Sequence, residues 1–550
     1  MDPLVSKGSA KPSRFRPFAF ARTMGSALAG LILLAAMLSG CAKKAAPADG
    51  PGNVLRLSQR NEPGNLDPAT ATLPDDFAVL RALCEGLLIP GPDGSAPRPG
   101  AAESFTVSPD GLTYTFRLRA ARWSNGEAVT AQHFVDAYQR ALTPATAAPK
   151  ASVFYPVKNA RAFVSGELSD FSAVGIHALD AKTLRLTLER ATPRFPYYVA
   201  SGPWLPVHVP TVVKHGRKWT EPGNFIGNGP FVLTEWRPQQ RIVMRKNPLW
   251  HGAATVKLAE IQFIRFDSGD AEERAFRTGQ VDVTMAVPEN KVPVYTREQP
   301  KALHRAPMIE TRYLSFNTQR APLNDPRVRR ALALAINAPR IAERVTRGGQ
   351  YAATRLLPPA LRASPTSTPL EHEFRSDPDA ARTLLAEAGV TGASLRKMEL
   401  SAWSNTPVLE AVQAMWKQEL GIDVAIVVRD ARVHLSSLAH GDYDIGFITA
   451  IPDVADPANL LADFITDAPE NYPQWSDAAF DRAYADAMSL AAEPARASGL
   501  ERAENRLLET APVAPLYFNT KVWLMSPRVR GWQEDGLWSR TYHEIYLADE

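Results

Sequence analysis

The chain has 550 residues, of which 45% are hydrophobic, 62 are Lys or Arg and 58 are Asp or Glu. Residues 1–40 hold five of the basic residues and one acidic residue, so the remainder carries 57 of each and is formally neutral. This balance removes any charge-based argument for nucleic acid or an anionic surface as a partner. The length is typical of two or three domains. With only two cysteines, Cys41 and Cys84, stability must come from burial and not from a disulfide framework.

Cys41 lies at the end of an apolar run, in the stretch LILLAAMLSGCAKK. Basic residues precede this run, which extends from about Met24 to Leu38 and is too short and wrongly flanked for a membrane span. We therefore predict a secretory signal over residues 1–40 and a flexible stem over 41–53. The letters LSGC resemble the lipobox of bacterial lipoproteins, which implies cleavage before Cys41 and lipidation of its thiol. An ordinary signal with a chance cysteine is the alternative.

The first half of the chain alternates strand-like and helical segments. Strands are predicted where apolar and polar residues alternate, and a helix is predicted after Thr130, whose side chain suits an N-cap. Its buried stripe would consist of Phe134, Tyr138, Ala141 and Leu142. The predicted strands are VLRLS from Val54, YTFRLR from Tyr114, TLRLTLER from Thr183 and RIVMRKN from Arg241.

The second half is richer in helices, particularly between residues 377 and 511. Asp325 followed by Pro326 predicts a helix start, with an inner face of Val328, Leu332, Ala335 and Ile336. We find no repeat at a fixed period. These segments together predict an α/β protein of mixed element order.

Signatures of catalysis, metals or cofactors are missing from the sequence. The ten histidines are scattered, and EHEF at Glu371 lacks the second histidine of a zinc helix. The glycines of GNGP, residues 227–230, precede a strand and favour a turn over a phosphate loop. Cys84 stands among apolar residues, which favours a small buried hydrophobe over a nucleophile. No cofactor and no metal are expected.

Six motifs follow one another along the chain: NEPGNLDPATA from Asn61, LCEGLLIPGPDG from Leu83, ARWSNGEAVTAQHFVDAYQRAL from Ala121, GNGPFVLTEW from Gly227, LSFNTQRAPLNDPRVRRALALAIN from Leu314 and MWKQELGIDV from Met415. In this order they resemble the oligopeptide- and dipeptide-binding solute-binding proteins of bacterial ABC importers. The resemblance runs from about Val54 to the C-terminus. It implies an α/β fold of the periplasmic-binding-protein type (type II, cluster C), with two main lobes, an extra domain and a hinged cleft. Residues 54–85, 209–308 and 522–550 would form lobe I, 86–208 the extra lobe II, and 309–521 lobe III.

The resemblance also implies a function without catalysis. An exported monomer, anchored through its lipid at the periplasmic or outer face of the cell membrane, would capture a peptide between its lobes and present it to permease and ATPase subunits. Within that class, the ligand could instead be a murein peptide, a modified peptide, an opine-like compound or a metal chelate. An exported hydrolase and a sensory or chaperone-like lipoprotein are the alternatives from other classes.

In the family, a peptide is held mainly through its backbone, and its α-ammonium pairs with an aspartate. The matching stretch here is AIPDVADP, and Asp453 stands at the amine-binding position. Asp456, followed by Pro457, reads instead as a helix N-cap. The resemblance adds further candidate ligand-binding residues, namely Lys150, Ala450, Ala71, Thr72, Leu73, Phe316 and Asn317.

Several positions depart from the family pattern. Ala450 and Val454 replace aromatic residues of the motif, Lys150 replaces a tyrosine, and Ala431 replaces a tryptophan of the cleft. Lys150 could form an ion pair with Asp453 and compete with an α-amine, receive a ligand carboxylate, or remain a solvated surface lysine. We expect a wider pocket and a changed ligand preference. Positions that are basic in well-known peptide binders read as Leu409, Leu438 and Phe447.

Overall fold

The computed structural model describes residues 53–92, 95–362, 369–395, 397–404, 406–533, 536–537 and 539–548. The predicted signal over residues 1–40, Cys41 and almost all of the predicted stem lie outside this part of the chain. Within it, no helix has both the length and the apolar character that crossing a membrane requires. Residues 52–550 form one compact unit, built around three sheets that each have a hydrophobic core.

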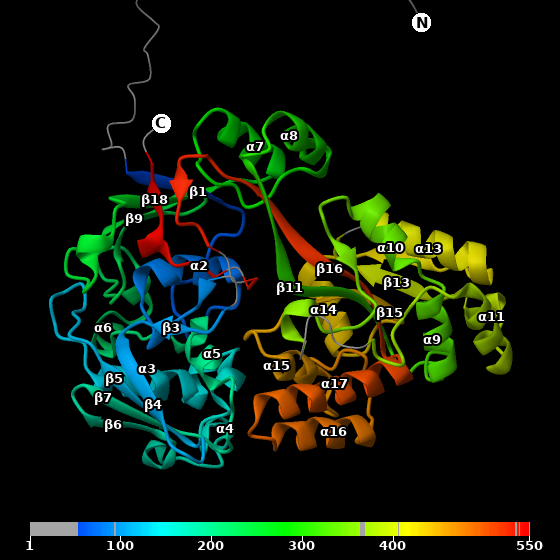
Figure 1. The fold of residues 1–550 in the computed structure, drawn as a ribbon, viewed down its shortest axis with the longest axis horizontal. Coiled ribbons are helices and arrows are strands. Elements are labelled where there is room, and N and C mark those ends of the chain that lie inside the picture. Colours follow the sequence, from blue (N-terminus) through cyan, green and yellow to red (C-terminus); the bar gives the residue numbers. More distant parts are fainter. Residues whose placement is uncertain are drawn as a thin grey trace, which may run out of the picture. The chain divides into compact units, whose positions relative to one another are not determined.

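Lobe I is the name used here for the sheet β1–β10–β9–β8 and the elements packed on it (Figure 1). The first strand runs parallel to β10, and the other pairs are antiparallel. The strands are β1 (Val54–Gln59), β8 (Phe231–Arg237), β9 (Arg241–Lys246) and β10 (Glu260–Arg265), with the short pairs β2 (Leu88–Ile89), β3 (Arg98–Pro99) and β17 (Val529–Arg530), β18 (Tyr546–Leu547). The helices are α2 (Pro74–Leu83), α6 (Val209–His215), α7 (Gly269–Arg277) and α8 (Val292–Glu298).

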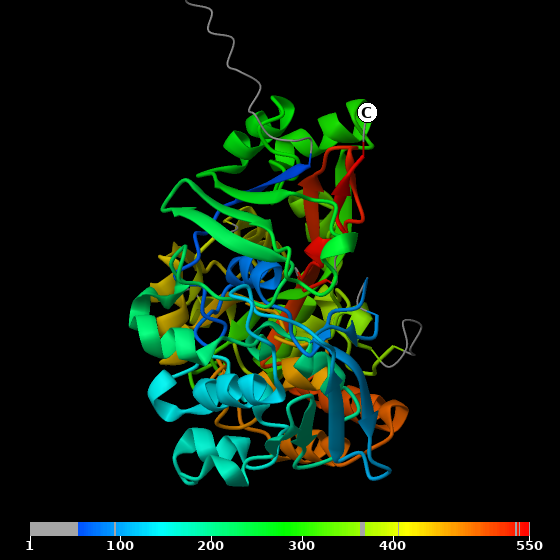
Figure 2. The same ribbon diagram turned by 90° about the vertical axis from the view of Figure 1, so that its left-hand side faces the viewer.

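Lobe II is the antiparallel sheet β4–β5–β7–β6 with its helices. A view turned by 90° shows this sheet well separated from the strands of lobe I (Figure 2). Its core is rich in aromatic side chains, among them Trp123, Phe134 and Trp204. The elements are β4 (Ala102–Val107), β5 (Thr113–Leu118), α3 (Ala131–Leu142), α4 (Ala160–Ser165), β6 (Ile176–Asp180), β7 (Thr183–Thr187) and α5 (Phe195–Val199).

Lobe III is the six-stranded sheet β12–β16–β11–β15–β13–β14 with the helices around it. Its strands are β11 (Leu303–Phe316), β12 (Tyr351–Ala352), β13 (Glu399–Ala402), β14 (Ala425–Val428), β15 (Ile445–Ala450) and β16 (Val513–Leu524). Its helices are α9 (Pro326–Leu334), α10 (Ala338–Ile341), α11 (Pro378–Glu387), α12 (Gly392–Leu395), α13 (Thr406–Leu420), α14 (Ala431–Ala439), α15 (Pro457–Leu461), α16 (Ala478–Met488) and α17 (Glu493–Thr510), with a π-helical turn at Ala342–Thr346.

Two long antiparallel strands, β11 and β16, join lobe I to lobe III (Figure 1). The N-terminal half of β11 and the C-terminal half of β16 pack near α8, where Leu303 is paired with Leu524. The C-terminal half of β11 and the N-terminal half of β16 belong to the sheet of lobe III. The register shifts between Pro307 and Thr311 and again after Arg312. Such irregularities bend and twist a strand pair, as two bodies joined at an angle require.

The structure confirms the local predictions. Strands begin at or next to Val54, Tyr114, Thr183 and Arg241, and the four apolar residues of the predicted stripe of α3 are all buried. Asp325 is the N-cap of α9, where its carboxylate accepts the N–H of Arg327 at 2.8 Å. Cys84 is buried, and burial raises the pKa of its thiol, so it is a poor nucleophile.

The predicted inner face of α9 needs one adjustment. Val328, Leu332, Ala335 and Ile336 are all buried, but the helix ends at Leu334 and the last two residues follow it. They stay in the core because Ala335 still has helical backbone angles as the C-cap. The buried face therefore extends beyond the helix that defines it.

Candidate functional site

A cavity of about 220 Å³ lies where loops of the three lobes meet. It is smaller than the roughly 300–1,000 Å³ of a typical pocket for a drug-sized ligand. Its walls are mainly apolar, and three charged side chains reach it. Among the lining residues, Thr72, Phe77 and Arg81 belong to lobe I, Lys150, Tyr197 and Gly202 to lobe II, and Ile451, Pro452, Asp453 and Val454 to lobe III, with Leu537 and Ser539 from the C-terminal segment.

Lys150 and Asp453 form an ion pair in this cavity, between Nζ and Oδ1. The two residues are 303 positions apart and come from different lobes. Their side chains keep 24% and 30% of their exposure, so the pair is accessible to solvent and to a ligand. Of the three roles that the sequence leaves open for Lys150, the structure places it in the ion pair with Asp453.

The loop that carries Asp453 is held rigidly from behind. Asn459 of α15 accepts the backbone N–H of Asp453 at 2.7 Å and that of Val454 at 3.2 Å. The side chain of Val454 is fully buried and belongs to the aromatic core of lobe II, although the rest of the loop belongs to lobe III. The loop therefore reaches out of its own lobe and presents Asp453 in a fixed position.

Helix α5 of lobe II contacts the same loop next to the cavity, beside α15 (Figure 1). Arg194 donates from Nη1 to the carbonyl of Ala455 and from Nε to Glu493, both at 2.7 Å. Tyr198 donates its hydroxyl to Asp456 at 3.3 Å. We call these three hydrogen bonds the α5 contact; together with Lys150–Asp453 they hold lobes II and III against each other.

Asp456 is a structural residue, in agreement with the sequence. It is the N-cap of α15, where it accepts the N–H of Ala458 at 3.0 Å. Arg496 Nη2 also donates to both of its carboxylate oxygens, at 2.9 and 2.7 Å, and both side chains are at most 1% exposed. A buried carboxylate needs such a partner because an unpaired charge in the interior is costly.

Two further carboxylates lie close enough to feel the charge of Asp453. Burial raises the pKa of Asp463 well above its usual value, the negative charges of Glu470 and Asp453 raise it further, and Lys150 opposes them. Burial by the surrounding protein likewise raises the pKa of Glu470, although this side chain keeps contact with solvent. Three carboxylates thus share one lysine, an arrangement that favours an additional positive charge.

Only part of the predicted site lines the cavity. Thr72, Lys150 and Asp453 do, whereas Ala71 is buried in the core of lobe I and Leu73, the N-cap of α2, points mainly to solvent. Ala450 ends β15 one residue before the lining begins.

Phe316 and Asn317 lie away from the cavity, in the interior of lobe III. Phe316 is fully buried in its core. The side-chain amide of Asn317 donates to the carbonyls of Gly441 and Tyr443, both at 2.9 Å, and its oxygen accepts the N–H of Gln319. Both side chains are therefore committed to the architecture of the lobe.

The positions that depart from the family pattern also differ in location. Val454 belongs to the core of lobe II and also lines the cavity. Leu409, Leu438 and Phe447 are fully buried in lobe III, and Ala431 is exposed at the start of α14. Burial explains the apolar character of Leu409, Leu438 and Phe447.

Sequence reasoning missed the contributions of α2 and α5. Phe77 of α2 lies against Gly202, where a Cβ would come within 2.2 Å of the ring, so only glycine permits this approach. Tyr197, on the other side, is covered by the guanidinium of Arg194 at 5.2 Å. Neither segment carries a local signal, because only the folded arrangement brings them to the cavity.

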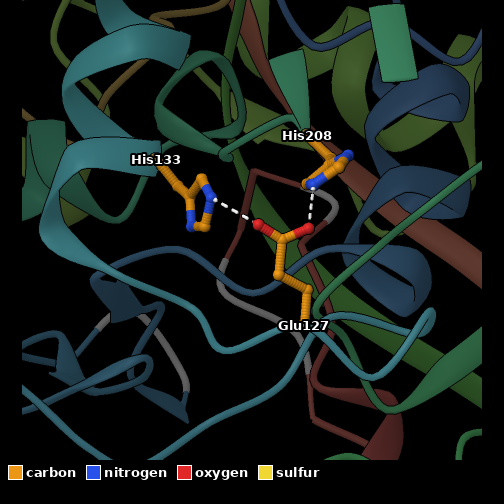
Figure 3. A group of neighbouring side chains, drawn as sticks. All are labelled: Glu127, His133 and His208. Carbon is orange, nitrogen blue, oxygen red and sulfur yellow. Dashed lines mark hydrogen bonds and ion pairs between the residues drawn. The ribbon is translucent and has the colours of Figure 1, made fainter. Parts of the chain in front are cut away.

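A second group of titratable side chains lies apart from the cavity, where Glu127 sits between His133 and His208 (Figure 3). One carboxylate oxygen is 3.4 Å from Nε2 of His133, and the other is 2.9 Å from Nε2 of His208. Such a group could hold a metal ion if the two nitrogens that face the carboxylate were free of protons.

The hydrogen bonds of His133 exclude that state. Its Nδ1 accepts the indole N–H of Trp123 at 3.2 Å and the backbone N–H of Thr130 at 3.1 Å. Since Nδ1 is an acceptor, the proton of the neutral ring is on Nε2, which points to Glu127. Burial lowers the pKa of His133, which keeps the ring neutral. The group is therefore a hydrogen-bonded connection between α3 and the start of α6.

The chain resembles known proteins over most of its length. The family described as "Bacterial extracellular solute-binding proteins, family 5 Middle" matches residues 96–472. The periplasmic murein peptide-binding protein MppA of Escherichia coli is 31% identical, over 88% of this chain and 92% of that protein. The probable deoxycholate-binding periplasmic protein YgiS of Escherichia coli is 30% identical, over 90% of this chain and 94% of that protein.

Solved structures agree with this assignment. The Escherichia coli murein tripeptide-binding protein MppA has a TM-score of 0.82 at 29% identity, covering 91% of this chain and 99% of that one. A structure of MppA described as its unliganded open form has a TM-score of 0.75, covering 90% and 98%. The arrangement found here is thus further from the open form, as expected with lobes II and III in contact.

Proposed function

Because the chain belongs to the bacterial extracellular solute-binding proteins of family 5, we propose that it captures peptides in the cavity between its lobes. It would deliver them to the permease and ATPase of an ABC importer. The observation that carries the proposal is the cavity itself, which residues of all three lobes line and which contains an accessible ion pair. The relative MppA is named as a murein peptide-binding protein, which supports a role in binding.

In this proposal, Asp453 binds the α-ammonium of the peptide. The ammonium displaces Lys150 Nζ from the carboxylate, and Asp463 and Glu470 stabilise the added charge. Lys150 is then free to bind a ligand oxygen or to stay nearby. Peptides must therefore compete with the amine of Lys150 for Asp453. This competition selects ligands whose ammonium binds Asp453 with a more favourable free energy than Lys150 does.

The lobe boundaries belong to the same proposal. We assign residues 54–85, 209–308 and 522–550 to lobe I, 86–208 to lobe II and 309–521 to lobe III, because each hydrophobic core draws nearly all of its residues from one of these sets. Five core residues cross the boundaries, and all but Val454 lie near the junction of lobes I and II. They are Ala69, Ala137, Leu205, Val207 and Val454.

Cys41 would carry the lipid that holds the exported protein at the membrane. Mass analysis of the mature N-terminus checks this directly. A diacylated or triacylated Cys41 supports the anchor, and a Cys41→Ser variant should then be released into the soluble fraction. An unmodified Cys41 in a soluble protein would contradict the lipid anchor and support an ordinary secretory signal.

The experiment that tests peptide capture is native mass spectrometry of the protein from residue 42 onward, purified without denaturation. The ligand that leaves with it is then released and sequenced. We expect a ladder of peptides, because binding through the backbone tolerates many side chains. A single non-peptide mass, such as a bile acid or a metal chelate, would contradict the proposal. The proposal would also be contradicted if the purified protein contained no bound ligand and bound no peptide on titration.

A further inference from the structure

Arg312 occupies a distinctive position on β11, beyond the first register shift and inside the sheet of lobe III. It lies directly opposite Thr449 of β15, which is four residues before Asp453. A chain spans at most about 3.3–3.6 Å per residue, so Thr449 and Asp453 are at most about 14 Å apart. Arg312 lies one strand further on, about 5 Å away, so its backbone is at most about 19 Å from that of Asp453, a span that an extended peptide can bridge.

The guanidinium of Arg312 is held in a defined orientation. Its Nε donates to Glu310 at 2.7 Å, and Glu310 is in turn fixed by Asn519 at 2.9 Å. The charged group lies 5.8 Å from the ring centre of Trp403 and 5.9 Å from that of Phe447. Stacking on aromatic rings immobilises a guanidinium and leaves its donors directed in the plane of the group.

The outer edge of this guanidinium is unused. The one hydrogen bond that Arg312 makes within the described part of the chain uses Nε, so neither Nη atom has a partner there, and the side chain keeps 18% of its exposure. Since Nε is occupied by Glu310, the two Nη atoms remain as a pair of parallel donors. Two parallel donors are the arrangement that a carboxylate accepts with both of its oxygens.

Other polar groups on this face of the sheet also lack partners. The buried hydroxyl of Thr449, opposite Arg312, has none. His434 donates from Nε2 to the carbonyl of Phe447 at 3.0 Å, so its buried Nδ1 is an acceptor, and it too is unpaired. The ring of His434 lies 5.4 Å from that of Trp403. Buried polar groups in native proteins are normally satisfied, so these two atoms are available to a bound molecule.

We propose that Arg312 binds the carboxylate of the ligand, with Trp403 and Phe447 as its supporting rings. This inference rests on the proposed function, because it assigns the second end of a peptide whose first end lies at Asp453. The span of at most about 19 Å accommodates a peptide of about three or four residues at roughly 3.3 Å per residue, with the side chains of Asp453 and Arg312 reaching its two ends. The positions that read as Leu409, Leu438 and Phe447 are apolar, and the positive charge comes from β11 instead.

The test compares alanine peptides of about two to five residues as free acids and as C-terminal amides. Dissociation constants are measured by calorimetry on the chain from residue 42 onward, which contains the whole compact unit, after bound ligands have been removed. A third set of amidated peptides carries one internal Glu, so that a side-chain carboxylate is distinguished from the terminal one.

We expect wild-type protein to bind a free acid of three or four residues at least about tenfold more tightly than its amide. In Arg312→Gln, this ratio should fall below about threefold. Because that change leaves Glu310 buried and unpaired, the double variant Glu310→Gln/Arg312→Gln provides the same readout with the buried charge removed. The matched control is Arg241→Gln, which removes a strand arginine whose Nε also donates to a glutamate, at 2.8 Å in lobe I. Its ratio should equal that of wild type.

Equal binding of acids and amides by wild-type protein would overturn the role of Arg312 and leave peptide capture intact. An acid preference that survives in both Arg312 variants would do the same. If only the amides with an internal Glu regain affinity, the site takes a side-chain carboxylate, and the assignment to the peptide terminus is wrong. If no peptide of any set binds, the proposed function fails, and this inference fails with it.

Discussion

At the residue scale, the proposed peptide site depends on one carboxylate and the cations that compete for it. Lys150 already holds Asp453 in the structure, and both side chains remain partly accessible. An ion pair of this kind is worth little by itself, because solvent screens it. Its importance is that any ammonium group from a ligand must displace Lys150 or bind beside it.

Asp453→Ala should weaken the binding of a peptide with a free α-amine by about 2 kcal/mol, the low end for removing one partner of a buried charge pair. Calorimetry with the parent and with the same peptide acetylated at its N-terminus measures this effect. Acetylation should cost the parent a similar amount and the variant almost nothing.

Lys150→Met is the informative companion variant. Since it removes the competing amine, we expect it to leave binding of the free-amine peptide unchanged or to strengthen it. Equal losses in Asp453→Ala and Lys150→Met would mean that the ion pair only holds the lobes together. The amine-binding role of Asp453 would then be wrong.

Asp463→Asn should raise the melting temperature, and more at about pH 7.5 than at about pH 4. The pKa of Asp463 is raised in the folded state, mainly by burial and then by Glu470 and Asp453, with Lys150 opposing. A folded protein whose carboxyl has a raised pKa loses stability as the pH rises from the unfolded value near 4 through the folded one. Asparagine carries no such charge, so its advantage appears on the alkaline side. A loss of stability that is equal at both pH values would contradict this explanation.

At the scale of elements, the buried ion pair between Asp456 and Arg496 joins the start of α15 to α17. It also holds the end of the loop that precedes α15. Arg496→Met leaves Asp456 without its partner in the interior, and we expect a loss of about 3–5 kcal/mol in the free energy of unfolding. Chemical denaturation measures it. The control is the double variant Asp456→Asn/Arg496→Met, which keeps an N-cap side chain without a buried charge. It should be clearly more stable than the single variant; if it is equally unstable, the loss comes from packing around Arg496.

The α5 contact connects two lobes, so its effect should be on ligand release. Arg194→Gln removes the donor to Ala455 and weakens the link to Glu493. We expect faster dissociation of the ligand with little change in melting temperature, measured by stopped-flow displacement. Arg161→Gln is the matched control, because this lobe II arginine only covers the ring of Tyr155, at 4.9 Å. Identical release from both variants would contradict a role in closure.

The elements show what can be predicted from the sequence. Strand β1, the N-cap Asp325 and the N-cap Asp456 depend on neighbours along the chain, and their signals are local. The wall formed by Phe77 and Gly202 depends on residues over a hundred positions apart, and no periodicity records it. The same holds for Val454, whose side chain fills the core of another lobe.

The candidate site was predictable only through the family pattern. That pattern indicated Asp453, Lys150 and Thr72, which line the cavity, and it also indicated Phe316 and Asn317, which do not. The difference is one of location, because Phe316 and Asn317 lie in the interior of lobe III, and a motif does not encode which of its residues the fold brings to the cavity. Arg312 was missed because its surroundings are made of Phe447 of β15 and Trp403, which directly follows β13.

At the scale of the whole molecule, the predicted α/β fold of type II periplasmic binding proteins is confirmed by the solved relatives that match almost the entire chain. Two strands, β11 and β16, carry the chain between lobes I and III, which is how a hinge can couple distant surfaces. The contacts of lobes II and III, and the lower similarity to the open form of MppA, describe an arrangement with these two lobes in contact beside the cavity.

The account predicts that a peptide stabilises the arrangement with lobes II and III in contact, because it binds this arrangement more tightly than the open one. Small-angle X-ray scattering of protein stripped of ligand, before and after adding a mixture of short peptides, tests this most directly. Native mass spectra of the same samples show how much protein is occupied. We expect the radius of gyration to decrease in proportion to occupancy, and to decrease less in Arg194→Gln at subsaturating peptide. Full occupancy with an unchanged radius would contradict capture by closure of the lobes, and absence of occupancy would contradict peptide binding itself.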